Sequence, residues 1–234
     1  MRRLWATRAP RAAGVLRAAV GTLACGWAIV VYSWITLPDV RVLRRGEPGQ
    51  TAFMALRAAE ADAAGQPGRT TRIWVPLDRI SPLLQRAVVV SEDAGFWGHT
   101  GIDMAELRIA FSEGLGDGDF RGASTLTQQL AKNFYLSPSR NPLRKLTELL
   151  LARRLEAELP KRRILELYLN VVEWGDGLWG AEAAARTYFG IPAASLDAGQ
   201  AALLAGALIN PRVYNPGQPN ARLLRRQAII LRRM

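Results

Sequence analysis

The feature that most constrains this chain is an uninterrupted apolar run near its N-terminus. Residues 18–37 contain no charged side chain and are mostly apolar. A helix of this length spans about 30 Å at a rise of about 1.5 Å per residue, which matches the hydrocarbon core of a bilayer. We therefore predict a transmembrane helix over residues 18–37.

The charges that flank this run predict its orientation. Five arginines precede it and three follow closely, at positions 2, 3, 8, 11 and 17 and at 41, 44 and 45. Because cationic flanks tend to stay in the cytoplasm, residues 1–17 are expected inside and residues 38–234 outside. The alternative is a cleaved signal peptide. Its apolar core would usually span about 7–15 residues and end at a small-x-small site, and no clear site of that kind follows.

The part expected outside the cytoplasm is basic. The chain has 31 Lys and Arg against 20 Asp and Glu, and without the five N-terminal arginines the balance is 26 to 20. Such a charge suits an anionic lipid surface or a phosphate-bearing ligand, whereas a nucleic-acid partner does not fit the predicted compartment. Cys25 and His99 are the sole residues of their kinds, which excludes an internal disulfide and a His-cluster metal site. A catalytic acid or base is therefore expected to be a carboxylate.

Beyond the apolar run, local signals predict a juxtamembrane connector over residues 38–72 and a mainly α domain over residues 73–234. Ser81-Pro82 and Asn141-Pro142 are typical helix starts. Helices are expected at 81–90, 103–113, 124–133, 142–159, 160–171, 180–188, 195–209 and 219–233. Glycines predict a mobile loop at 114–122 and a flexible corner at 175–180. No stretch alternates strongly enough to predict a sheet.

Two adjacent carboxylates, Glu92 and Asp93, end the first helix of the domain. A carboxylate is unfavourable at the negative C-terminal end of a helix, and partial burial there would raise its pKa. A carboxylate with a raised pKa suits a general base working near neutral pH. The alternative is a solvated acidic pair at a helix end. His99 lies six residues after Asp93. The alternative to a functional role for His99 is an ordinary structural one.

Three further clusters gather polar donors. Thr125, Gln128 and Lys132 share one face of a helix, Glu148 lies one turn from Arg144, and three cations open the helix at 161. The three lysines of the chain, at positions 132, 145 and 161, all fall in these clusters. Since an ammonium is a compact point charge that binds phosphate, this placement favours an anionic ligand. An ordinary amphipathic helix and a plain salt bridge are the alternatives.

Four motifs in order resemble those of the family 51 peptidoglycan glycosyltransferases. They are Glu-Asp-x-x-Phe-x-x-His-x-Gly (92–101), Gly-Ala-Ser-Thr-x-x-Gln-Gln-x-x-Lys-Asn (122–133), Arg-Lys-x-x-Glu (144–148) and Lys-x-x-Ile-Leu-Glu-x-Tyr-Leu-Asn (161–170). The resemblance covers about residues 75–233. Within the family, the chain is similar to the monofunctional, membrane-anchored branch of biosynthetic transglycosylases. One departure is Pro160, where many members have Ser.

This resemblance implies a lysozyme-like helical domain that polymerises lipid II into β-1,4-linked glycan strands and releases undecaprenyl pyrophosphate. It implies that Glu92 takes the proton of the acceptor hydroxyl and that Glu148 is a second catalytic carboxylate near the pyrophosphate. The substrate-binding residues it implies are Asp93, Phe96, His99, Ser124, Thr125, Gln128, Gln129, Lys132, Asn133, Arg144, Lys145, Lys161 and Asn170.

The resemblance also implies surroundings for the reaction. A divalent cation, Mg²⁺ or Mn²⁺, would bridge the pyrophosphate oxygens beside Glu148. The expected partners are lipid II, the growing glycan strand, the bacterial inner membrane, and other proteins of cell-wall synthesis and division. Exposed apolar side chains such as Trp97, Phe111, Leu115 and Phe120 would receive the polyprenyl tails.

Two other functions remain open at this point. A lysozyme-like enzyme that cleaves peptidoglycan would use a carboxylate and water, and it would need no cationic site for a pyrophosphate. A membrane-anchored scaffold of the cell-wall machinery would use the basic face for docking and would tolerate loss of Glu92.

Overall fold

The computed structural model describes residues 9–66, 68, 70–104, 108, 124–135 and 142–234. The chain divides into two compact units, residues 1–38 and residues 39–234. We describe each unit by itself.

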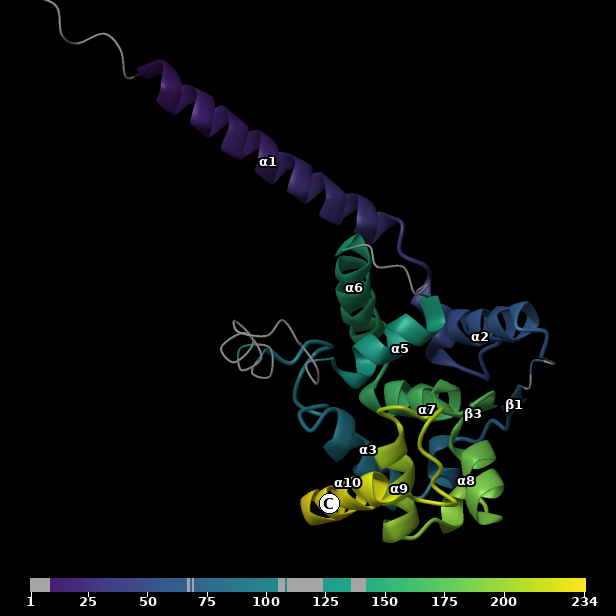
Figure 1. Ribbon diagram of the computed structural model, residues 1–234. Coiled ribbons are helices and arrows are strands. Elements are labelled where there is room, and N and C mark those ends of the chain that lie inside the picture. Colours follow the sequence, from purple (N-terminus) through teal and green to yellow (C-terminus); the bar gives the residue numbers. More distant parts are fainter. Residues whose placement is uncertain (1–8, 67, 69, 105–107, 109–123, 136–141) are drawn as a thin grey trace, which may run out of the picture. The chain divides into compact units, whose positions relative to one another are not determined.

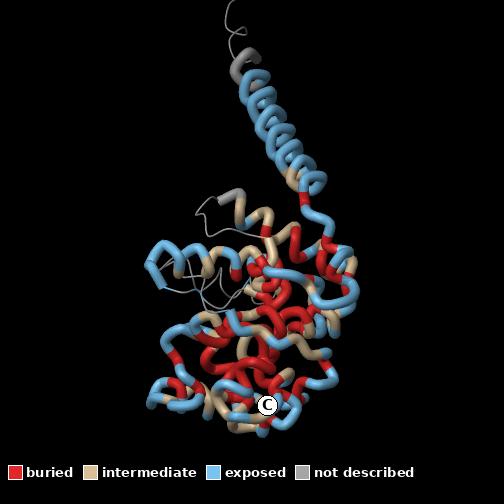
Figure 2. The backbone as a smooth tube through the Cα atoms, turned by 90° about the vertical axis from the view of Figure 1, so that its right-hand side faces the viewer, coloured by how far each residue is buried: buried red, intermediate tan, exposed pale blue. Residues whose placement is uncertain are grey.

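The N-terminal unit is a single long helix, α1 (Ala9–Ile35). Its segment Ala13–Ile35 is long and apolar enough to cross a membrane, by length and composition. Most of its described residues are exposed, as the pale blue tube in Figure 2 shows. The exposed residues include apolar ones such as Leu23, Trp27 and Tyr32. A helix whose apolar side chains are exposed suits a lipid environment. The predicted span of 18–37 overlaps this helix and extends two residues beyond its end.

The second unit is mainly α, as predicted (Figure 1). Its helices are α2 (Ala52–Ala63), α3 (Pro82–Glu92), α5 (Leu126–Tyr135), α6 (Pro142–Glu158), α7 (Lys161–Val171), α8 (Ala181–Phe189), α9 (Ala198–Ala207) and α10 (Ala221–Arg233). Short 3₁₀ helices lie at Val40–Arg44, Leu77–Arg79 and Ala193–Ser195. Helix α5 packs against α2, α6 and α7, while α9 packs against α3 and α10. Helix α7 contributes most of its length to the core.

Several helices begin where the sequence predicts, because a side chain accepts a hydrogen bond from a free backbone N–H of the first turn. Ser81 caps α3 with Pro82 at the first helical position. Thr51 caps α2, and Asn220 caps α10. Asp197 and Gln200 form a reciprocal capping box at the start of α9. These starts are local, which is why the sequence alone predicts them.

The prediction that no sheet forms is wrong. Strands β1 (Thr71–Arg72), β2 (Glu173–Gly175) and β3 (Leu178–Trp179) make a small sheet in the order β1-β3-β2. Strand β3 pairs parallel with β1 and antiparallel with β2. Strands of two or three residues are too short for alternation to show, and β2 and β3 are buried on both faces. The expected glycine corner is therefore a packed hairpin.

Residues 39–72, expected to be a connector, are part of the second unit. Helix α2 packs against α5, and β1 pairs with β3. The Arg163 Nε donates to the carbonyl of Leu43 at 2.8 Å. The boundary between the two compact units lies between residues 38 and 39, next to the predicted end of the transmembrane helix. The expected loop at 114–122, and nearly all of the expected helix at 103–113, fall outside the described residues.

Candidate active site

Glu92 is the last residue of α3, and its side chain turns toward α5. Its Oε2 accepts a hydrogen bond from the Gln129 Nε2 at 3.1 Å. Burial raises the pKa of Glu92, and the hydrogen bond from Gln129 and the charges of Arg226 and Lys132 oppose that rise. The raised pKa was predicted, and its physical cause is desolvation of the carboxylate. A half-buried carboxylate of this kind can hold a proton taken from a substrate.

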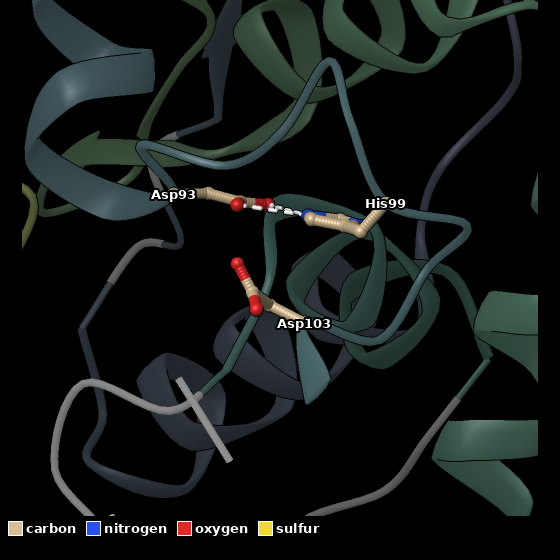
Figure 3. Close-up of side chains that lie close together, drawn as sticks. All are labelled: Asp93, His99 and Asp103. Atoms are coloured by element: carbon tan, nitrogen blue, oxygen red, sulfur yellow. Dashed lines mark hydrogen bonds and ion pairs between the residues drawn. The ribbon is translucent and has the colours of Figure 1, made fainter. Parts of the chain in front are cut away.

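Asp93 and His99 form a buried dyad beside this carboxylate (Figure 3). The His99 Nε2 lies 2.9 and 3.0 Å from the two Asp93 oxygens. The Gly101 N–H donates to His99 Nδ1, so Nε2 carries the proton and donates to Asp93. Asp93 Oδ2 also accepts from the N–H of Leu126, the first residue of α5. The dyad therefore ties the end of α3 to the start of α5, and the predicted contact of Asp93 and His99 with substrate stays a prediction.

Asp103 completes a group that has the composition of a metal site. Figure 3 shows its carboxylate below the Asp93–His99 pair, and the candidate ligand atoms of the three residues lie within 4.8 Å of one another. His99 Nε2 would have to leave Asp93 in order to bind an ion. Since both ring nitrogens already have partners, the hydrogen bonds account for this cluster without a metal.

The start of α5 brings together several predicted substrate residues. The Thr125 hydroxyl accepts from the Gln128 N–H at 3.2 Å and donates to the Gly101 carbonyl at 2.8 Å. Thr125 thus caps the start of α5, whereas the buried Gln128 Oε1 has no hydrogen-bond partner in the described part of the chain. Ser124 is half-buried, Asn133 is buried, and Lys132 is exposed.

Glu148 lies on α6, the helix that packs against α5. It is buried, its Oε1 contacts the Lys145 ammonium, and its Oε2 lies 3.8 Å from Arg144 Nη1. The Lys145 side chain is half exposed, and the buried Nε of Arg144 has no partner among the described residues. Glu148 thus pairs with two cations whose remaining N–H groups can donate to a ligand.

Two other predicted substrate residues, Lys161 and Phe96, contact each other inside the protein. The Lys161 ammonium lies 4.3 Å from the centre of the Phe96 ring and 2.7 Å from Glu156 Oε1. Phe96 is fully buried. Of the three cations in the first turn of α7, Lys161 pairs with Glu156 and Arg163 pairs with Glu166. These two charges therefore have acidic partners within the protein. Lys161 and Phe96 thus have partners within the protein, and their predicted contact with substrate stays a prediction.

Asn170, another predicted substrate residue, makes hydrogen bonds within the protein, and its contact with substrate stays a prediction. It has no exposed surface, and its side chain exchanges hydrogen bonds with the backbone N–H and carbonyl of Val75 at 3.0 and 2.9 Å. Its Nδ2 also donates to the Glu166 carbonyl. Gly180, at φ +84°, lets its backbone approach that of Asn170, where a Cβ would lie 2.8 Å from the carbonyl oxygen.

The comparisons with known proteins agree with this geometry. A family model described as Transglycosylase matches residues 60–234. The chain belongs to the transglycosylase family. Relatives named biosynthetic peptidoglycan transglycosylase share 50% identity in Rhodospirillum centenum, over 88% of this chain and 82% of the relative, and 48% in Laribacter hongkongensis, over 80% and 82%. The relative of that name in Chromobacterium violaceum is 43% identical over 88% of this chain and 91% of its own length.

Membership of this transglycosylase family confirms three predictions. The fold is a lysozyme-like, mainly α domain, the enzyme class is a peptidoglycan glycosyltransferase, and the process is synthesis of glycan strands for the cell wall. Sequence reasoning assigned no role to Tyr168 or Glu156. Tyr168 contacts Gln129, and Glu156 holds both Lys161 and the Thr127 hydroxyl. Neither contact has a local signal, because each joins different helices.

Proposed function

We propose that this transglycosylase polymerises lipid II, with Glu92 as the general base for the acceptor hydroxyl. The acceptor oxygen attacks the anomeric carbon of the growing strand and the bond from that carbon to the pyrophosphate oxygen breaks. Glu92 takes the hydroxyl proton, and the undecaprenyl pyrophosphate leaves with the bonding electrons. The attack comes from the face opposite to the leaving group, so the configuration inverts. The observation that carries this proposal is the desolvated carboxylate of Glu92, oriented by Gln129.

The reaction is difficult because negative charge develops on the leaving pyrophosphate. The two cations that pair with Glu148 can stabilise that charge. Lys145 and Arg144 are oriented before the substrate arrives, which lets them stabilise charge as it develops on the pyrophosphate. Lys132 is exposed on α5 and adds a third positive charge near Glu92. The unpartnered Gln128 Oε1 and Arg144 Nε support a polar ligand in this region.

The predicted Mg²⁺ or Mn²⁺ ion stays a prediction. Mg²⁺ is commonly held by one or two carboxylates together with waters and substrate phosphates. Glu148 is the carboxylate that would hold such an ion, and it pairs here with Lys145 and lies near Arg144. These two cations suit phosphate oxygens directly.

The membrane helix and the substrate tails belong together in this proposal. We propose that residues 38–234 lie outside the cytoplasm at the bacterial inner membrane, as the flanking arginines predict. Trp97 is exposed beside the site and would contact a polyprenyl chain, whereas Phe111, Leu115 and Phe120 lie outside the described residues. A membrane-impermeant thiol reagent added to intact cells should label cysteines introduced at exposed positions of the second unit. Labelling only after lysis would show that the second unit lies in the cytoplasm, opposite to the proposed topology.

The proposed reaction is tested with the purified full chain and labelled lipid II. Glycan polymer should form, and intact sacculi should not be cleaved. Because burial raises the pKa of Glu92, the base is protonated and inactive at low pH. Activity should rise with pH through an apparent pKa above the ordinary value of about 4.3 for glutamate. Release of fragments from sacculi without polymer formation would favour the cleaving enzyme instead.

A further inference from the structure

Two hydrogen bonds join three helices at Glu92. The Tyr168 hydroxyl on α7 donates to Gln129 Oε1 on α5 at 2.9 Å, and Gln129 Nε2 donates to Glu92 Oε2 at the end of α3 at 3.1 Å. Tyr168 is fully buried. The chain of contacts therefore reaches from the core of the domain to the carboxylate.

The direction of these hydrogen bonds is determined by the groups at both ends. Burial, together with the charges of Glu92 and Asp93, keeps the pKa of Tyr168 well above its ordinary value, so the hydroxyl keeps its proton. That proton meets Gln129 Oε1, which leaves the amide N–H groups to face the carboxylate. The Ser124 carbonyl, 3.5 Å from Gln129 Nε2, favours the same orientation. A flipped amide would place an oxygen against the Glu92 carboxylate.

We propose that Tyr168 is a positioning residue for glycan polymerisation, which holds the Gln129 amide with its N–H toward Glu92. This inference rests on the proposed role of Glu92 as the base. Tyr168 does not touch the substrate, since it has no exposed surface. Its effect reaches the reaction through the ionised form of Glu92, which the Gln129 hydrogen bond stabilises.

The test replaces the hydroxyl alone. In Tyr168→Phe the amide loses its partner, and ionised Glu92 loses part of its stabilisation. We expect the rising limb of the pH–rate profile to move up by about 0.5 to 1 pH unit and the rate at pH values on that limb to fall about three- to tenfold, as for loss of one oriented hydrogen bond. The matched control is Tyr188→Phe, because the Tyr188 hydroxyl also donates one hydrogen bond, to the Trp174 carbonyl at 3.0 Å, away from Glu92. Its pH profile should not move.

A measurement without substrate separates this inference from the proposed function. Carboxyl ¹³C NMR of the full chain, with the Glu92 signal assigned by Glu92→Gln, follows that titration directly. Tyr168→Phe and Gln129→Met should each raise the pKa of Glu92, and the double variant should raise it no further than Gln129→Met alone. If Tyr168→Phe does not fold, as judged by circular dichroism, Gln129→Met alone must give the shift.

The possible outcomes are distinct. An unchanged Glu92 titration in a folded Tyr168→Phe, or in Gln129→Met, overturns the positioning role even where the wild type polymerises lipid II. A shifted titration in a protein that makes no glycan supports the hydrogen-bonded arrangement and removes the proposed function. An equal shift in Tyr188→Phe would also overturn the inference, because the effect would then not pass through Gln129.

Discussion

Glu92→Gln should abolish polymer formation, with a loss of about 10²- to 10⁴-fold in kcat, the range for removal of a general base. The amide cannot take the proton of the acceptor hydroxyl, yet it has nearly the shape of the carboxylate. Binding of lipid II should change little, since the cations around Glu148 are untouched. The measurement is the initial rate of polymer formation from labelled lipid II, with binding measured separately.

The matched control for this variant is Glu173→Gln. Glu173 is also a carboxylate whose pKa is raised by burial, and it pairs with Arg57 at the small sheet. Since Glu173 has no contact with the described site residues, its variant should retain the wild-type rate. Full activity in Glu92→Gln would leave the scaffold interpretation in place and exclude Glu92 as the base.

The stability of Glu92→Gln gives an independent check with a defined sign. Burial raises the pKa of Glu92 in the folded chain, so its ionised form lowers the free energy of unfolding. The favourable contribution exists at low pH and is lost as the pH rises through the raised pKa. At pH 7 the variant should therefore unfold at the same temperature as the wild type or higher. A lower unfolding temperature would mean that lost activity reflects a damaged fold.

Glu148→Gln should reduce kcat by about 10²- to 10³-fold, the range for loss of one oriented electrostatic element in an active site. Glu148 is buried and holds Lys145 and Arg144 in place. Removing its charge leaves both cations attractive to pyrophosphate but no longer oriented toward the leaving oxygen. We therefore expect KM to stay constant or fall while kcat drops.

Glu182→Gln is the corresponding control for Glu148. Glu182 is equally buried, pairs with Arg186 one turn away and accepts the Ala193 N–H. Its substitution should cost stability through lost hydrogen bonds without changing kcat. If Glu148→Gln lowered stability and left kcat intact, as expected for Glu182→Gln, Glu148 would be an ordinary salt-bridge partner.

The sequence alone determined the features that depend on near neighbours. The apolar run of residues 18–37 predicts a helix long and apolar enough to cross a membrane, because that property depends only on length and hydropathy. Ser81-Pro82 predicts the start of α3 because a cap acts within one turn. The order of four motifs predicted the family, and the end of α3 predicted the raised pKa of Glu92.

Packing decided which protein groups the predicted residues contact. Lys161 and Asn170 stand in one motif, and each has a partner on another segment of the chain. Gln129 is 37 residues from Glu92 and 39 from Tyr168, so no local pattern reveals that it joins them. A hydrogen bond between helices forms only when the core places both side chains within about 3 Å, and that placement is the sum of many long-range contacts. Tertiary structure therefore determined the surroundings of Glu92, whereas the sequence determined that a carboxylate stands there.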